Sequence, residues 1–359
     1  MNFTQLRSRM RPLLDTGISI ELISAPGRGK STFIDDSIDL YSEQDGEEWG
    51  LSKLFLATQT PPDLIGYQFK GEREWDGKKV AVTDPTLPGW MVTRTGKPVF
   101  AYKRGILFLD EYGQGEADVK RSSAELLLNG QLGPWKLPKG WSVVAASNRS
   151  SDRSGVTKSF DFVINRRLEV HISDDLDSWN EWANKNNVSA LAIYFAKEHT
   201  NVVFNDGVPE KQGPWCTPRS LVMCDRMLRA LSKDGETFPD DPEAVELASG
   251  IIGAAAAQQF FVAVKLEREM PAYETIVANP KKAKLPDKID AQYLIAHKLA
   301  HKVSEEDITP VIEYVTRMPK ELQVTMARAS VLRNRKLIAT PAMLKWTKEN
   351  SSLLAAIAL

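Results

Sequence analysis

A phosphate-binding loop is indicated at 24–31, which reads Ser-Ala-Pro-Gly-Arg-Gly-Lys-Ser. This segment follows an apolar run at 18–23 that is typical of a strand, and it precedes a predicted helix at 31–41. A strand, a tight Gly-rich turn and a helix N-terminus together aim backbone N–H groups at phosphate oxygens. Lys30 would place its positive charge on the β- and γ-phosphates, and Ser31 would offer a hydroxyl to Mg²⁺.

The nucleotide-binding residues that we predict from this loop are consecutive: Pro26, Gly27, Arg28, Gly29, Lys30, Ser31 and Thr32. The two glycines would let the backbone approach a phosphate without a Cβ clash, and Thr32 would reach the α-phosphate. Ser24 stands where the usual pattern has its first glycine, and a serine must accept a turn geometry that glycine adopts more easily. The alternative is a turn that resembles a phosphate loop by chance. It is disfavoured because the strand and the helix fall where the mechanism needs them.

A second candidate motif is a pair of carboxylates at the end of an apolar strand. Asp110 and Glu111 follow the run Gly-Ile-Leu-Phe-Leu at 105–109, and the carboxyl end of a strand is where an α/β sheet presents its chemistry. Asp110 would hold Mg²⁺, directly or through water, and Glu111 would orient and deprotonate an attacking water. An isolated Asp-Glu pair more often marks a solvated acidic turn. Here the distance from the phosphate loop leaves room for a strand and a helix, which favours the catalytic interpretation.

Both motifs lie in a half of the chain whose pattern is typical of a parallel α/β sheet, with short apolar runs between polar or helical segments. Runs rich in Ile, Val, Leu and Phe predict strands at 18–23, 53–57, 106–109, 142–146 and 168–172. Segment 67–102 breaks the pattern with Gly, Pro, Trp and charges. We interpret it as hairpins or loops inserted into the sheet domain.

The rest of the chain is predicted to be helical. Spacing and N-terminal signals indicate helices at 174–185, 189–198, 218–232, 242–266, 291–302, 305–317 and 341–358. Ser304 with Asp307 has the pattern of a capping box, and Thr340 with Pro341 that of a cap followed by proline. A Pro/Lys-rich connector covers 279–290. We therefore expect a sheet domain at 1–173, a helical lid at 174–280 and a helical C-terminal extension at 281–359.

Composition restricts the class of protein. The chain has 359 residues, which suggests about two domains, and its formal net charge of −1 does not indicate a nucleic-acid partner. Cys216 and Cys224 match no zinc or redox spacing and are expected to stay reduced. The uncharged stretch 247–264 is long enough for a bilayer, but Gln258 and Gln259 within it favour a buried helix. The N-terminal segment lacks the apolar run of a signal peptide, so we expect a cytoplasmic protein.

The order of these segments resembles that of AAA+ ATPases, in particular the MoxR-like branch. Segments 24–31 and 105–111 match the Walker A and Walker B motifs, and 60–67 is similar to the family's segment after the second strand. Segments 126–132 and 135–148 are similar to its short hairpin and fourth strand. The resemblance implies an α/β P-loop NTPase. Its parallel five-stranded sheet would be flanked by helices and followed by an α-helical lid and a helical C-terminal extension, with ATP and Mg²⁺ bound.

The resemblance also gives roles to residues outside the two motifs. Asn148 is similar to the sensor-1 residue, which positions the lytic water. Arg166 stands where the family places its arginine finger, with Arg167 as the alternative and Arg153 as a weaker candidate. Arg219, in the sequence Thr-Pro-Arg-Ser, is similar to the sensor-2 residue that touches the γ-phosphate from the lid. The competing interpretation of each arginine is a surface salt bridge.

Two further groups of residues are interpreted as structural. His297 and His301 are placed on an exposed or half-buried helix face rather than in a metal site, because Lys298 stands where the zinc-protease motif has a carboxylate. The tryptophans of the first half lack the basic interleaving of a nucleic-acid platform and are expected to pack in the inserts; they are Trp49, Trp75, Trp90, Trp135 and Trp141. By resemblance, the segment 67–102 corresponds to the family's helix-2 insertion, which faces the ring pore.

A finger supplied in trans requires an oligomer, and the resemblance implies a hexameric ring with nucleotide at its subunit boundaries. The function it implies is ATP-driven remodelling of a protein partner, as for MoxR-like chaperones, often with a von Willebrand factor A-type partner. One alternative is a nucleic-acid motor or loader, which the near-neutral charge disfavours. A second alternative is a nucleotide-gated scaffold with little turnover, which the intact Asp110-Glu111 pair disfavours.

Overall fold

The structure is a computed structural model that describes residues 1–152, 155–156, 160–205, 207–235 and 237–351. The chain divides into two compact units, and the division follows Asp174. The first unit contains the predicted sheet domain. The predicted lid and C-terminal extension lie together in the second unit, so the expected boundary near residue 280 falls inside it.

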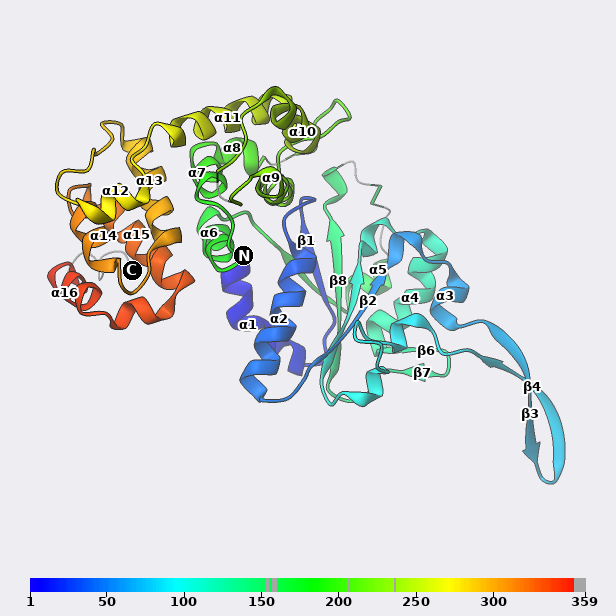
Figure 1. The fold of residues 1–359 in the computed structure, drawn as a ribbon. Coiled ribbons are helices and arrows are strands. Elements are labelled where there is room, and N and C mark those ends of the chain that lie inside the picture. The colour runs from blue at the N-terminus through cyan, green and yellow to red at the C-terminus, as the bar shows by residue number, and fades with distance from the viewer. Residues whose placement is uncertain (153–154, 157–159, 206, 236, 352–359) are drawn as a thin grey trace. The chain divides into compact units, whose positions relative to one another are not determined.

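A five-stranded parallel sheet forms the centre of the first unit, in the order β2-β5-β8-β1-β9, and it is flanked by helices as predicted (Figure 1). Its strands are β1 (Ile20–Ser24), β2 (Gly50–Phe55), β5 (Gly105–Asp110), β8 (Trp141–Asn148) and β9 (Leu168–His171). These are the five predicted strands with small shifts at their ends. The register pairs Ser24 with Asn148 and Phe55 with Asp110, so the carboxyl ends of the strands meet at one edge.

Alternate residues of the strands pack on opposite faces of the sheet, as the pleat requires. Ile106 and Phe108 of β5 join the core on one face, whereas Leu107 and Leu109 join the core on the other. All four side chains are fully buried. Burial on both faces explains why the strands read as continuous apolar runs.

Helices cover both faces of the sheet (Figure 1). The first face is packed by α1 (Phe3–Asp15) and α2 (Lys30–Asp45), and the second by α3 (Pro61–Ile65), α4 (Ala117–Asn129) and α5 (Asp161–Ile164). Short 3₁₀ turns are η1 (Leu56–Thr58), η2 (Gly89–Met91), η3 (Val99–Ala101), η4 (Tyr112–Gln114) and η5 (Ser150–Asp152). The helix α1 was not predicted.

The inserted segment forms a long hairpin, as predicted, made of β3 (Gln68–Trp75) and β4 (Lys78–Pro85). It extends away from the sheet domain (Figure 1). Phe69 and Trp75 are 61% and 58% exposed, so the prediction that Trp75 packs in the insert is wrong, whereas Trp90 and Trp141 are buried. A two-stranded hairpin without a covering layer has no apolar side to bury its tryptophan. The predicted short hairpin before the fourth strand is β6 (Gln131–Leu132) with β7 (Trp135–Lys136).

The described part of the second unit is helical and shares one apolar core. Its helices are α6 (Leu176–Lys185), α7 (Ala190–Glu198), α8 (Thr200–Val203), α9 (Pro218–Leu231), α10 (Pro242–Ile252), α11 (Ala254–Arg268), α12 (Tyr273–Ala278), α13 (Ile289–Lys302), α14 (Ile308–Val315), α15 (Lys320–Arg333), η6 (Arg335–Ala339) and α16 (Pro341–Glu349).

The single helix predicted at 242–266 is instead two helices, α10 and α11, that meet at Gly253. Gly253 has a φ of +83°, and a Cβ there would lie 2.7 Å from the carbonyl oxygen of Pro214, so only glycine fits this corner. The break divides the uncharged stretch 247–264, which is long enough for a bilayer, between two shorter helices. Among the described residues, every helix is too short or too polar to cross a membrane.

Candidate nucleotide site

The carboxyl ends of three neighbouring strands bring the predicted motifs together. β1 leads into the loop at 24–29, β5 ends at Asp110, and β8, which lies between these strands, ends at Asn148. Parallel strands present their carboxyl ends at the same edge of a sheet, which is where α/β proteins bind ligands. The side chains that follow the three strands therefore lie within reach of one another.

The loop itself has the backbone that its glycines allow. Gly27 and Gly29 have φ angles of +74° and +88°, in the left-handed region where other residues are strained. Gly29 is the N-cap of α2, whose first residue is Lys30. The first N–H groups of a helix have no partner within the helix, so this turn offers donors to a phosphate. Of the flanking predicted residues, Pro26 is half-buried and Thr32 is exposed.

The Lys30 ammonium lies at the centre of the cluster, with the residue only 8% exposed. Its Nζ donates to Asn148 Oδ1 at 2.9 Å, to Ser24 Oγ at 3.0 Å, and to the carbonyl oxygens of Ser24 and Ala25 at 3.3 Å each. Ser24, which departs from the usual glycine, thus supplies an acceptor to the lysine. Its φ is not left-handed, so the awkward turn geometry expected for a serine does not arise.

Ser31 and Asp110 form the second contact of the cluster. Ser31 Oγ donates to Asp110 Oδ2 at 2.7 Å, and both residues are half-buried. Mg²⁺ prefers oxygen ligands and commonly takes one or two protein groups together with substrate phosphates. A hydroxyl beside a carboxylate next to a phosphate loop fits that requirement. The described residues include no group of three His, Cys, Asp or Glu side chains that could hold a metal ion. Mg²⁺ at this place would therefore need phosphate oxygens as further ligands.

Glu111 has a backbone conformation that marks it as unusual. Its φ is +51°, and its N–H donates to Oδ1 of Asp110 at 3.0 Å. A left-handed conformation in a residue other than glycine costs on the order of 1–3 kcal/mol and is concentrated at active sites. The carboxylate pair therefore occupies a turn that the surrounding structure holds in place, directly after the strand that carries Asp110.

Arg28 has a side chain that turns away from solvent. Its Nε lies 3.0 Å from Oδ1 of Asp174, and the arginine side chain is 3% exposed. The structure therefore gives its guanidinium a carboxylate partner.

The candidate arginines differ in how far their side chains are exposed. Arg167 has a side chain that is 3% exposed and pairs with Glu21 and Glu169, which disfavours the alternative assignment of Arg167 as finger. Arg166, directly before it, is exposed. Arg219 is exposed in the first turn of α9, in the second unit. Arg153 lies outside the described residues.

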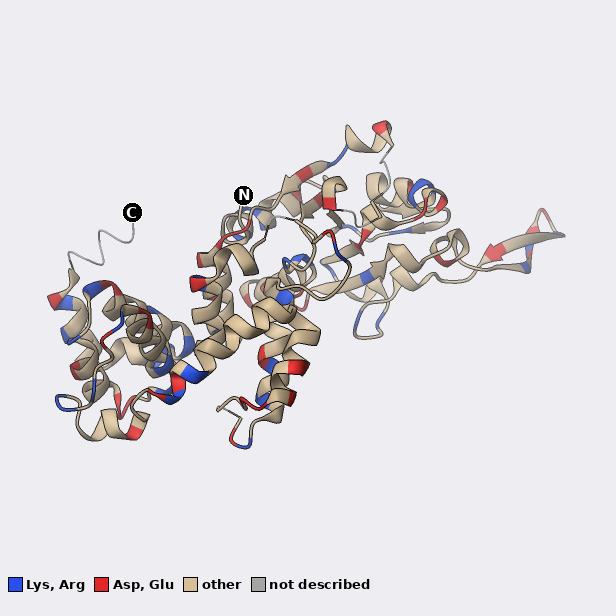
Figure 2. Cartoon of the chain, turned by 90° about the horizontal axis from the view of Figure 1, so that it is seen from above, with Lys and Arg blue, Asp and Glu red and all other residues tan. Residues whose placement is uncertain are grey.

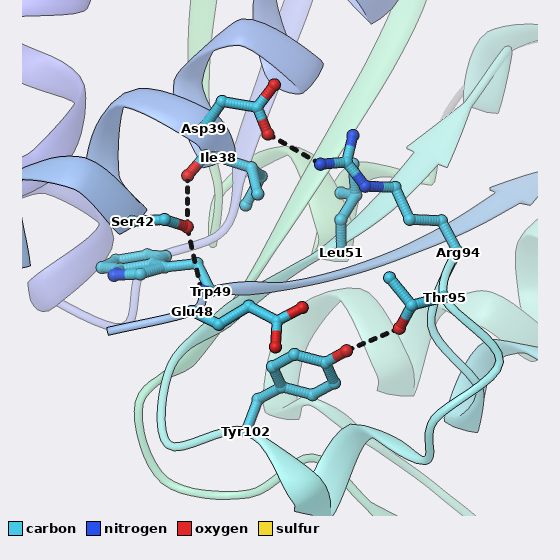
Figure 3. A pocket seen from close by; sticks show the side chains of 9 residues that line it. All are labelled: Ile38, Asp39, Ser42, Glu48, Trp49, Leu51, Arg94, Thr95 and Tyr102. Carbon is cyan, nitrogen blue, oxygen red and sulfur yellow. Dashed lines mark hydrogen bonds and ion pairs between the residues drawn. The ribbon is translucent and has the colours of Figure 1, made fainter. Parts of the chain in front are cut away.

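A pocket of about 260 Å³ elsewhere in the sheet domain is not this site (Figure 3). It lies beside Leu51 at the start of β2 and Ser42 near the end of α2, whereas Ser31 is in the first turn of α2. Ser42 lies eleven positions after Ser31 in this helix, a distance of roughly 16 Å along the helix axis. At its rim, Arg94 Nη2 lies 2.8 Å from Asp39 Oδ1. This pocket is thus at the opposite edge of the sheet from the candidate site.

One histidine of the pair is more buried than predicted. His297 is 3% exposed, and His301 is half-buried with Nε2 against Nη2 of Arg333. The prediction of an exposed or half-buried face for both is therefore wrong for His297. α13 is covered by α7 and α15, which pack on several of its sides.

Known proteins match this chain weakly. No family model matches the sequence, and no curated protein matches it. Among solved structures, a candidate ATPase from Cytophaga hutchinsonii is 16% identical, with 74% of this chain and 90% of that chain covered at a TM-score of 0.33. A RuvB variant from Thermotoga maritima is 11% identical, with coverages of 78% and 76% at a TM-score of 0.38. NtrX from Brucella abortus, solved in complex with ATP, is 13% identical, with coverages of 98% and 67% at a TM-score of 0.37. Likeness at this level establishes neither a family nor a function for this chain.

Proposed function

We propose that this protein binds MgATP at the carboxyl edge of its sheet and hydrolyses it. The observation that carries the proposal is a pair of contacts, from Lys30 to Asn148 at 2.9 Å and from Ser31 to Asp110 at 2.7 Å. Four residues predicted from three separate strand ends thus lie in one cluster. A cation, a hydroxyl, a carboxylate and an amide together are what a nucleoside triphosphate, its metal ion and an attacking water require.

Each side chain then has one task. Lys30 holds its charge on the β- and γ-phosphates, which requires it to exchange some of its present acceptors for phosphate oxygens. Asn148 orients the attacking water, and Glu111 accepts the proton that this water loses. Mg²⁺, when bound, neutralises charge on the phosphates, and Ser31 and Asp110 are the residues that would hold it.

The same proposal includes a ring of AAA+ type, with MoxR-like remodelling of a protein partner as its purpose. Exposure of Arg166 supports a role in trans, because a finger must reach the nucleotide of a neighbouring subunit. The exposed aromatic side chains of the β3–β4 hairpin support contact with a protein. Acidic and basic residues are interspersed along both units in Figure 2, which favours a protein partner over nucleic acid.

Phosphate release by the wild-type protein and by Lys30→Ala tests the reaction. We expect Mg²⁺-dependent turnover in the wild type and loss of both nucleotide binding and turnover in the variant, since the phosphates lose their fixed cation. Arg94→Ala, at the other edge of the sheet, is the matched control and should turn over normally. Equal rates for the wild type and Lys30→Ala would refute the site.

Mixed rings test the trans arrangement. Arg166→Ala should lower turnover by on the order of 10³-fold while leaving nucleotide binding intact. Neither Arg166→Ala nor Lys30→Ala should be active alone, but a mixed ring contains boundaries with an intact Lys30 on one side and an intact Arg166 on the other. Activity that rises on mixing supports the ring. Full activity of Arg166→Ala at a dilution where sizing shows only monomer would contradict it.

A further inference from the structure

A second polar cluster lies inside the sheet domain, around the strand β1 that leads into the nucleotide site. Glu21, in β1, is 2% exposed, and its Oε2 lies 2.5 Å from Nη2 of Arg167. The other carboxylate oxygen accepts a hydrogen bond from Ser147 Oγ on the neighbouring strand β8. Nη2 of Arg167 also lies 2.8 Å from Oε1 of Glu169. One buried carboxylate thus joins the strand before the phosphate loop, the strand that ends at Asn148 and the segment that carries Arg166.

Two further buried side chains cover this pair. The Arg167 guanidinium lies 5.6 Å from the ring centre of Tyr112, and Lys120 Nζ lies 5.7 Å from the same ring. Tyr112 is fully buried and Lys120 is 1% exposed. Burial raises the pKa of Glu21 and lowers the pKa of Lys120 to about 8. Replacement of a buried ion pair by apolar residues of similar volume is often neutral or stabilising, so stability of the fold alone does not explain these charges.

Three members of the cluster are the sequence neighbours of residues with proposed catalytic roles. Ser147 precedes Asn148, Tyr112 follows Glu111, and Arg167 follows Arg166. The turn after Glu111 is also in close contact with β8, because a Cβ on Gly113 would lie 3.0 Å from Cβ of Ser147. Three chain segments that each present one of these residues are therefore fixed to one another through buried side chains.

We infer that Glu21 is a positioning residue for the arginine finger: its carboxylate holds Arg167, and through Arg167 it fixes Arg166 relative to strand β8. The inference rests on the proposed ring ATPase. Glu21 lies inside the sheet and acts only through the residues it binds. A finger displaced by about 1 Å can lower turnover roughly 100-fold without any change in the site that binds the nucleotide.

A paired apolar substitution separates positioning from folding. Loss of one partner would leave a buried charge, whereas replacement of both partners by apolar residues of similar volume often preserves the fold. We therefore choose Glu21→Leu combined with Arg167→Met. The expected result is nucleotide affinity within about three-fold of wild type and turnover lowered by roughly 30- to 100-fold.

The matched control is a second arginine–carboxylate pair in the same unit. Arg11 binds Asp45 through two contacts of 3.0 and 2.9 Å, and its guanidinium lies 4.8 Å from the ring centre of Trp49. Like the Glu21 pair it combines an ion pair with an aromatic ring, but it borders no residue with a proposed catalytic role. Arg11→Met with Asp45→Leu should leave turnover within about two-fold of wild type.

The deciding measurement is the ATPase activity of rings mixed from the Glu21→Leu/Arg167→Met subunit and the Lys30→Ala subunit. The first keeps an intact Lys30 and the second an intact finger segment, so activity should recover on mixing, as it should for Arg166→Ala with Lys30→Ala. Three results would overturn the inference: no recovery where the Arg166→Ala mixture does recover, wild-type turnover by the paired variant alone, or loss of its nucleotide binding. Absence of turnover in the wild type would instead refute the proposed function, and the inference with it.

Discussion

The nucleotide cluster of the first unit and the histidine cluster of the second both gather polar side chains from several elements, but they differ in how their central side chains are paired. Lys30 contacts four oxygen atoms, and Ser31 donates to Asp110. In the second unit, neither ring nitrogen of His297 has a hydrogen-bond partner among the described residues. His301 meets the guanidinium of Arg333 rather than a carboxylate.

The pairing of the arginines distinguishes a structural cluster from a binding cluster. Arg333 is held by the turn after α6, with Nη1 2.7 Å from Asn187 Oδ1 and Nη2 2.8 Å from the Val188 carbonyl oxygen. Arg229 donates to the Asn187 carbonyl oxygen at 2.6 Å. These contacts clamp a turn whose residue Asn187 has a φ of +57°. The arginines there stabilise the fold, whereas Ser31, Asp110 and Asn148 at the carboxyl ends of the strands are half-buried and can exchange their partners for a ligand.

The largest effect that would sharpen this comparison is expected for Asp110→Ala. Loss of the carboxylate removes the partner of Ser31 and half of the proposed Mg²⁺ ligand pair. A metal ion contributes several kcal/mol to stabilisation of the transferring phosphoryl group, so turnover should fall by at least ~100-fold. Phosphate release measured across a Mg²⁺ titration is the test. A normal rate at the wild-type Mg²⁺ requirement would show that Asp110 does not hold the metal.

A smaller effect is expected for His297→Leu, on stability rather than on turnover. Removal of a buried polar group without partners should raise the free energy of unfolding by about 1–3 kcal/mol at pH 7. Burial lowers the pKa of His297 from 6.5 to about 3, so the unfolded chain binds more protons between these values. The wild type therefore loses stability as the pH falls through this window, and the variant should lose less.

Denaturant unfolding from pH 7 to pH 4 measures both effects of His297→Leu. His171→Gln is the control, because the His171 side chain is 71% exposed and should change stability by less than about 0.5 kcal/mol. If His297→Leu is less stable than the wild type at pH 7 and equally sensitive to acid, the imidazole has a partner and the contrast between the two clusters fails.

The smallest effect is expected for Ser24→Ala. The hydroxyl is one of several acceptors of Lys30, and its removal leaves the ammonium with fewer bonds to give up when a phosphate binds. We expect ATP to bind about two- to five-fold more tightly, a change below 1.4 kcal/mol. Titration calorimetry with a nucleotide that is not hydrolysed would measure it. Binding weakened by more than about ten-fold would indicate that Ser24 contacts the nucleotide itself.

The sheet was predictable from the sequence because strands buried on both faces read as apolar runs, and each of the two motifs follows such a run. Helix α15 was missed for the opposite reason. Its buried residues include Leu322, Gln323, Val324 and Met326, which follow one another round the helix, so no amphipathic stripe marks it. Helix α1, by contrast, carries a sequence signal, because Asn2 and Gln5 form a capping box at its start.

The candidate site was likewise predictable only in part. Lys30, Ser31 and Asp110 were placed by motifs whose spacing fixes their neighbours. The bond from Lys30 to Asn148 and the burial of Arg167 against Glu21 depend on the register of β1 with β8 and β9. A sequence states which residues occupy adjacent strands only after the strand order is known, so these partners required the structure.

The most direct test of the central claim, that this edge of the sheet hydrolyses ATP, is a comparison of nucleotide binding and phosphate release in Glu111→Gln. The amide is nearly isosteric with the carboxylate and can still orient water, but it cannot accept a proton. The proposed mechanism predicts ATP affinity within about three-fold of wild type and turnover reduced by at least ~100-fold. Turnover at the wild-type rate would contradict the assignment of Glu111 as the base and, with it, the proposed chemistry of the site.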